Sequence, residues 1–72
     1  MIEMDVMNDY GVWQKWWRNF YEYHNAQGVD MEDDKEITRT LAEWRAIDRD
    51  PESTVFYFEN EKDQMLFMLR WS

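Results

Sequence analysis

The stretch TVFYF, residues 54–58, is the most strand-like segment of this sequence. It begins with two β-branched residues and continues with three aromatic ones, a composition typical of β-strands. Because side chains alternate across a strand, Val55 and Tyr57 fall on one face, and Phe56 and Phe58 fall on the other. Both faces are therefore apolar, which is typical of a strand covered on both sides. We expect this strand to lie in the middle of a sheet.

Two further segments are expected to pair with this central strand. Residues 1–7, MIEMDVM, alternate apolar and acidic side chains and predict a half-buried strand. Residues 45–49 come before the turn sequence DPES, residues 50–53, in which Pro51 fixes its own φ. The segments 45–49 and 54–58 therefore predict a β-hairpin.

Two segments between the first strand and the hairpin predict helices. The first helix is expected to begin at Asn8 or Asp9, whose side chains can cap a helix, and to end just before Gly28. The second is expected to begin in the acidic run of residues 30–36, because carboxylates are favoured at the positive end of a helix dipole. The pattern leaves open whether this second helix ends before or after Trp44.

The last predicted helix begins after Asn60, a favoured N-cap residue. Its apolar residues form an unbroken run, residues 65–69, so the helix is apolar on two sides. The side that we expect to face the sheet is formed by Met65, Met68 and Leu69. Phe67 and Trp71 form a second stripe, which we expect to contact the tryptophans of the first helix or another subunit.

These elements predict a single α+β domain, residues 1–72, in the order β-α-α-β-β-α. A right-handed crossover would make the first and second strands parallel. The third strand can then insert between them in the antiparallel direction, which gives a three-stranded sheet of order 1-3-2. We expect the helices to pack on one face of this sheet.

The composition favours a protein that binds another protein. The chain has 72 residues and no Cys, which excludes disulfides and Cys-based zinc sites. Chains this short usually need a further source of stability, such as an oligomeric interface. Five Trp, four Tyr and four Phe are more aromatic residues than so small a core requires, so we expect self-association, most simply as a homodimer with two-fold symmetry. The residues expected at its interface are Phe56, Phe58, Phe67, Trp71, Trp13 and Trp17.

Sixteen acidic residues against eight basic ones give a net charge of −8. This charge disfavours binding to nucleic acid and to anionic membranes. It keeps an aromatic-rich chain soluble, and an alternative hypothesis is that it imitates nucleic acid and inhibits a host nucleic-acid-binding protein. The expected contacts of such an inhibitor are the acids of residues 48–52 and an acidic patch of Asp30, Glu32, Asp33, Asp34 and Glu36. No signal peptide or membrane span is visible, so we expect a cytoplasmic protein.

The sequence carries no catalytic signature. His24 is the only His, and no acidic residue is placed to orient it as a general base. Residues 48–59 partly match the spacing of a calcium loop, but Ser53 stands where that loop requires Gly. We therefore expect no enzymatic activity, no cofactor and no bound metal.

The C-terminal part combines an aromatic strand, the motif Asn-Glu-x-Asp and a helix of the form L-F-x-L-R-W. The residues of this pattern are Phe56, Phe58, Asn60, Glu61, Asp63, Leu66, Phe67, Leu69, Arg70 and Trp71. The pattern resembles small uncharacterised proteins encoded by tailed phages of marine bacteria. The resemblance implies a phage-encoded α+β protein of the host cytoplasm, and it implies no activity, cofactor or site residue.

Overall fold

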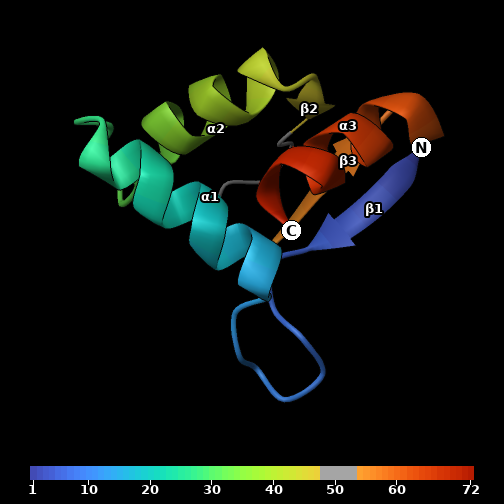
Figure 1. Ribbon diagram of the computed structural model, residues 1–72, viewed down its shortest axis with the longest axis horizontal. Helices are drawn as coiled ribbons and strands as arrows, with labels where there is room; N and C mark the ends of the chain where they lie inside the picture. The colour runs from blue at the N-terminus through green and yellow to red at the C-terminus, as the bar shows by residue number, and fades with distance from the viewer. Residues whose placement is uncertain (48–53) are drawn as a thin grey trace.

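The helices and strands follow one another in the predicted order (Figure 1). The structure is a computed structural model, and it describes residues 1–47 and 54–72. The elements are β1 (Ile2–Asp5), α1 (Lys15–Ala26), α2 (Asp34–Glu43), β2 (Ala46–Ile47), β3 (Val55–Phe58) and α3 (Glu61–Trp71). The predicted turn at residues 50–53 and the end of the predicted strand 45–49 lie outside the described residues.

The sheet has the predicted order, with β3 in the middle. β1 pairs with one edge of β3 in the antiparallel direction, so that Met4 lies opposite Phe56. β2 pairs with the other edge, also antiparallel, so that Ala46 lies opposite Phe58. Because both outer strands run against β3, they run in the same direction as each other. The prediction of a 1-3-2 sheet with parallel outer strands is therefore confirmed.

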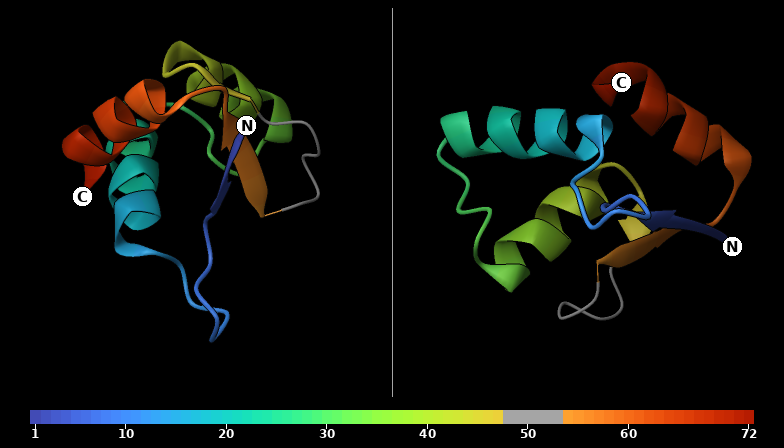
Figure 2. Two further views of the ribbon diagram at one scale, coloured as in Figure 1. Left: turned by 90° about the vertical axis from the view of Figure 1, so that its right-hand side faces the viewer. Right: turned by 90° about the horizontal axis from the view of Figure 1, so that it is seen from below.

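Two helices, α1 and α3, cover one face of the sheet (Figure 2). Figure 2 shows α1 and α3 on the same side of the strands, and α2 contacts β2 at the edge. Phe56 and Phe58 point into this layer and are buried. On the opposite face of β3, Val55 and Tyr57 are half-buried. The core therefore lies between the sheet and the helices, and it contains all four Phe side chains and three of the five Trp side chains.

The start of α1 differs from the prediction. A helix start at Asn8 or Asp9 is wrong, because α1 begins at Lys15. The backbone N–H of Gln14 donates to the carbonyl of Val6 at 2.7 Å, which closes a loop that turns the chain back on itself. Asn8 keeps its ability to satisfy backbone N–H groups but uses it within this loop. A capping residue identifies a turn, and it does not say whether a helix follows at once.

The end of α1 follows the prediction. Gly28 has a positive φ of 90°, the left-handed conformation that glycine adopts without steric cost. Its N–H donates to the carbonyl of Asn25, and the N–H of Val29 donates to the carbonyl of His24. This pair of hydrogen bonds is the Schellman motif, which satisfies the last free carbonyls of the helix.

α2 ends before Trp44, which settles the alternative that the sequence leaves open. Trp44 is the C-cap, and the next residue, Arg45, has a positive φ of 64°. The chain then leaves the helix axis and enters β2. Leu41 anchors α2 to the core and is almost completely buried.

The inward side of α3 is its aromatic stripe, which contacts a tryptophan of the first helix as predicted: the ring centroids of Phe67 and Trp16 lie 5.8 Å apart. Met68, which we expected on the inward side, is partly buried and packs against the core. Phe67 and Trp71 are buried, whereas Met65 and Leu69 are exposed. The prediction that Met65 and Leu69 face the sheet is therefore wrong. Phe67 and Trp71 lie one turn apart, and their rings bury more apolar surface than the aliphatic side chains could. The aromatic stripe, together with the buried Asp63, is the inward side.

Candidate interaction surface

Most of the aromatic residues expected at a dimer interface lie inside the chain's own core. Trp17, Phe56, Phe58, Phe67 and Trp71 are all buried. The ring of Phe67 lies 5.8 Å from that of Phe56 and 5.4 Å from that of Phe58. These five side chains are therefore not offered to another chain in this fold. Trp13 is the exception: it is 38% exposed and packs against Tyr21 at 5.0 Å between ring centroids.

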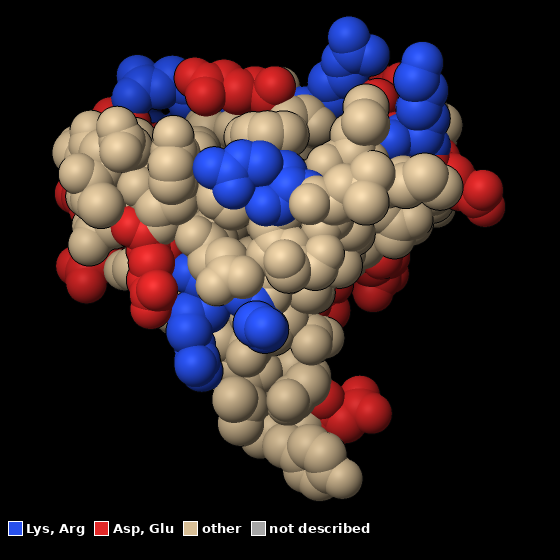
Figure 3. Space-filling view, in the orientation of Figure 1, with Lys and Arg blue, Asp and Glu red and all other residues tan. Residues whose placement is uncertain are grey.

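The outer face of α3 is the clearest exposed apolar surface on a helix. Its side chains Met65, Leu66 and Leu69 are 61%, 53% and 74% exposed, respectively. Leu69 lies four residues after Met65 and three after Leu66, spacings at which side chains are neighbours on a helix, so these three form one patch. We call them the α3 outer face. In Figure 3 this side of the molecule shows uncharged surface over α3, between groups of basic side chains.

A groove runs beside the α3 outer face, between α3 and the end of α2. Its volume is about 440 Å³. The residues that line it are Glu43, Trp44, Arg45, Lys62, Asp63, Leu66 and Arg70. Leu66 belongs both to the groove and to the α3 outer face, so the two features are continuous. Trp44, which is half-buried, contributes the aromatic part of the lining.

Basic side chains surround this groove. Arg45 comes from the turn after α2, and Lys62 and Arg70 come from the two ends of α3. The guanidinium carbon of Arg70 lies 4.1 Å from the ring centroid of Trp71 and 5.0 Å from that of Tyr23. Such stacking holds an Arg side chain in place while leaving its N–H groups able to bind an anion.

The acidic residue beside Arg45 is Asp63, and its carboxylate already contacts two side chains of this chain. An oxygen of Asp63 lies 3.6 Å from the guanidinium of Arg45, and the Asp63 side chain is only 10% exposed. The other oxygen of Asp63 accepts a hydrogen bond from the side chain of Asn60 at 3.3 Å. Arg45 itself is 80% exposed. The groove therefore presents the positive member of this pair to solvent.

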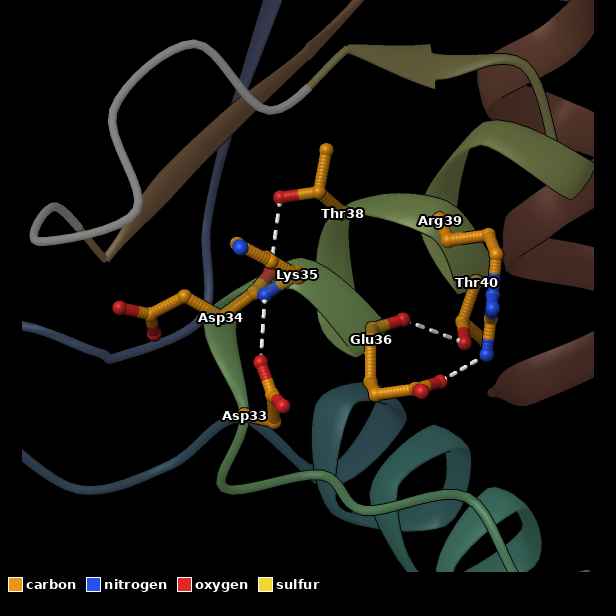
Figure 4. A network of polar contacts seen from close by, with 7 residues as sticks. All are labelled: Asp33, Asp34, Lys35, Glu36, Thr38, Arg39 and Thr40. Carbon is orange, nitrogen blue, oxygen red and sulfur yellow. Dashed lines mark hydrogen bonds and ion pairs between the residues drawn. The ribbon is translucent and has the colours of Figure 1, made fainter.

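Three acids of the predicted acidic patch, Asp33, Asp34 and Glu36, lie at the start of α2 (Figure 4). Asp33 is the N-cap and accepts from the N–H of Lys35 at 2.9 Å, while Asp30 accepts from the N–H of Glu32. Glu36 pairs with Arg39 in the next turn. Asp30 and Asp33 thus stabilise the local backbone, and Glu32 and Asp34 are exposed. The acids of residues 48–52 lie outside the described residues.

The loop before α1 projects from the body of the protein (Figure 1). Tyr10 at its tip is 90% exposed. The side-chain oxygen of Asn8 accepts from the N–H groups of Tyr10 and Val12, at 2.9 and 3.1 Å. Gly11 completes the turn with a positive φ of 73°. The loop is held by its own hydrogen bonds and presents an aromatic side chain at a second place on the surface.

His24 is a packed histidine. Its Nδ1 donates to the carbonyl of Phe20 at 2.8 Å, and its ring lies 5.2 Å from that of Trp71. The side chain is buried. Within residues 1–47 and 54–72, no three or more His, Cys, Asp and Glu side chains are placed to hold a metal ion.

The α3 outer face and the basic groove are missing from the sequence-based prediction, which assigns Met65 and Leu69 to the core. One signal in the sequence could have revealed the error. Asp63, Phe67 and Trp71 recur every four residues, and two of these three are aromatic. The largest side chains of a two-sided helix are the better guide to its buried side. The groove has no such signal, because Arg45 and Lys62 meet only in the folded chain.

Within the described part of the chain, no helix has the length and apolar character required to cross a bilayer. Comparisons of this chain with protein-family models, with curated proteins and with solved structures find no match. The resemblance to phage proteins rests on sequence patterns, chiefly the C-terminal one, and stays a prediction. The surface described above is the basis for the functional proposal.

Proposed function

We propose that this chain is a small interaction protein that contacts its partner through the α3 outer face. The observation that carries the proposal is the exposure of Met65, Leu66 and Leu69 side by side on a helix whose opposite side forms the core. Contiguous exposed apolar side chains on a small soluble domain are typical of a protein-binding site. A helix seated in the core is also a rigid platform for such a site.

An enzymatic role finds no support among the described residues. The only His donates to a backbone carbonyl and is buried among aromatic rings. A general base must reach the proton that it removes from a substrate. A binding role requires only the surface that the fold provides.

Self-association stays a prediction, and the fold weakens the argument for it from the number of aromatic residues. The aromatic surplus that suggests a dimer is packed inside the chain. A standard interface buries roughly 800 Å² on each partner, and three partly exposed aliphatic side chains supply on the order of a few hundred Å². A stable dimer would therefore need further contacts beyond the α3 outer face.

Inhibition of a nucleic-acid-binding protein by charge mimicry also stays a prediction. Fewer acidic residues are now expected to contact that protein. Asp30 and Asp33 accept backbone hydrogen bonds, and Glu36 pairs with Arg39. The other two members of the acidic patch, Glu32 and Asp34, are exposed. Substitution of these two with Lys would test mimicry without removing the cap of α2.

The proposal is tested by replacing Leu66 and Leu69 together with Ser. A matched control replaces Tyr10 and Val12 with Ser, because these side chains are also apolar and exposed but lie in the loop before α1. Both variants should keep the helical circular dichroism of the wild-type protein. The tagged proteins are then used to capture partners from the native host, and the mass of each protein alone is measured by light scattering.

The expected result is that an association made by the wild-type chain, with another protein or with itself, survives in the control and is lost in the Leu66→Ser/Leu69→Ser variant. The proposal is overturned if the association persists in that variant. It is also overturned if the wild-type protein is a monomer and captures the same host proteins as the Leu66→Ser/Leu69→Ser variant.

A further inference from the structure

The groove beside the α3 outer face has a charge opposite to that of the whole protein. The chain carries 16 acidic and eight basic residues, yet the residues that line the groove include three basic and two acidic ones. One of the two acids, Asp63, is mostly buried and paired. Glu43 is then the only lining acid directed to solvent. The surface offered to a ligand is locally positive.

The same groove has an apolar side. Leu66 lines it and continues into Met65 and Leu69 on the α3 outer face. Lys62 and Arg70 lie near the two ends of α3, so the apolar side chains are bordered by a basic group at each end. Apolar residues at the centre with charges at the rim are the usual arrangement of a protein-binding surface.

We propose that the groove and the α3 outer face together bind an acidic amphipathic helix of a partner protein. This inference rests on the proposed function and specifies the chemistry of the partner. Apolar side chains on one face of the bound helix would pack against Leu66 and Leu69, as in other helix-in-groove complexes. Its carboxylates would pair with Lys62 and Arg70 at the rim, where complementary charge selects among partners.

A second copy of this chain is a poorer occupant of the surface. Packing two α3 outer faces together would bring the Lys62 and Arg70 side chains of both copies into one interface, and like charges across an interface disfavour association. The acidic patch of this chain does not supply the required helix either. Asp30 and Asp33 there accept backbone hydrogen bonds within their own turn.

The backbone of Arg45 is a second observation at the same groove. Arg45 has a φ of 64°, in the left-handed region that favours glycine. Non-glycine residues held in such conformations cluster at active sites, ligand clamps and switch regions. The Arg45 conformation places an exposed guanidinium in the lining of the groove, where it can bind a carboxylate of the partner.

The experiment measures peptide binding by fluorescence anisotropy. The probe is a labelled helical peptide of about 15 residues, since shorter helices are marginal in water. It carries Leu at helical spacing on one face and Glu on the other. A second peptide has Lys in place of every Glu. Binding is measured from about 0.01 M to about 1 M salt, over which the Debye length falls from about 30 Å to about 3 Å.

The acidic peptide is expected to bind at low salt, and its binding should weaken as salt is added. The Lys peptide should bind at least about tenfold more weakly, because it meets the basic rim with like charge. Replacing Lys62 and Arg70 with Gln should weaken the acidic peptide by about tenfold. The matched control replaces Lys15 and Arg18, exposed on α1, with Gln and should change binding by less than about threefold.

This inference is overturned if the acidic peptide fails to bind, if the two peptides bind equally, or if the α1 control weakens binding as much as the Lys62/Arg70 change does. The inference is also overturned if the wild-type protein has the mass of a dimer and the Leu66→Ser/Leu69→Ser variant has the mass of a monomer. That result would identify a second copy of the chain as the occupant of the α3 outer face. If the acidic peptide fails while partner capture still depends on Leu66 and Leu69, the proposed function stands and only the partner chemistry is wrong.

Discussion

Arg45 has a backbone conformation that costs stability. It follows the last turn of α2, at the position where helices commonly end in a left-handed glycine. A side chain with a Cβ is strained there. Its ion pair with Asp63 is long, at 3.6 Å, and mostly solvent-exposed on the Arg45 side. Such a pair contributes little stability, so the strain is not offset by this contact alone.

Replacing Arg45 with Gly is therefore expected to stabilise the protein. Relief of the left-handed strain should raise the free energy of unfolding by about 1 kcal/mol. The control is Arg45→Ala, which keeps the strain and removes only the ion pair, at a cost of no more than about 0.5 kcal/mol. Urea denaturation followed by Trp fluorescence measures both. Equal stabilities of the Gly and Ala variants would show that the backbone at this position is not strained.

Side chains cap α2 and α3, whereas α1 begins without a side-chain cap. Asn60 caps α3 by accepting from the N–H of Asp63 at 3.0 Å, and Asp33 caps α2. Gln14 occupies the same position at the start of α1, with extended backbone angles, but its side chain makes no capping hydrogen bond. The first turn of α1 also contains no acidic residue. The helix that supplies Trp16, Trp17 and Phe20 to the core thus has the weakest N-terminus.

A better cap at residue 14 should therefore stabilise α1. Gln14→Asp is expected to raise the free energy of unfolding by about 0.5–1 kcal/mol, through a hydrogen bond to the first turn and a favourable charge at the helix N-terminus. Gln14→Asn provides the same hydrogen bond without the charge and should give a smaller gain. Thermal unfolding followed by circular dichroism compares the three proteins. A melting temperature that does not rise in either variant contradicts the prediction.

At the scale of the whole molecule, Phe67 lies at the centre of the aromatic core. Its ring lies within 6.2 Å, between centroids, of rings from α1, from β3 and from the end of α2. The partners are Trp16, Phe20, Trp44, Phe56 and Phe58. A chain of 72 residues buries a smaller share of its surface than a larger domain does and is only marginally stable, so a single central ring carries a large part of its stability.

Phe67→Ala is expected to lower the free energy of unfolding by about 3–5 kcal/mol, which is most of the stability of so small a domain. The matched control is Leu69→Ala on the opposite side of the same helix, where a 74% exposed side chain should change stability by less than about 0.5 kcal/mol. Chemical denaturation of the two variants measures the difference. A similar loss in both would mean that α3 presents its other side to the core.

The local pattern of side chains was sufficient to predict the order of elements and the central place of β3. Alternation in Val55–Phe58 and capping at Asn60 are properties of neighbouring residues, so they can be read from the chain directly. The end of α1 at Gly28 belongs to the same class, because it depends on one backbone conformation.

The tertiary structure decided which side of α3 is buried, where α1 begins and which charges meet. α3 is apolar on two sides, and only the rings of α1 and β3 select Phe67 and Trp71 over Met65 and Leu69. The start of α1 depends on Val6 accepting from Gln14 across the loop. The basic groove exists because the end of α2 packs beside α3. Each of these outcomes is a choice between locally acceptable alternatives, and contacts between residues distant in the chain make that choice.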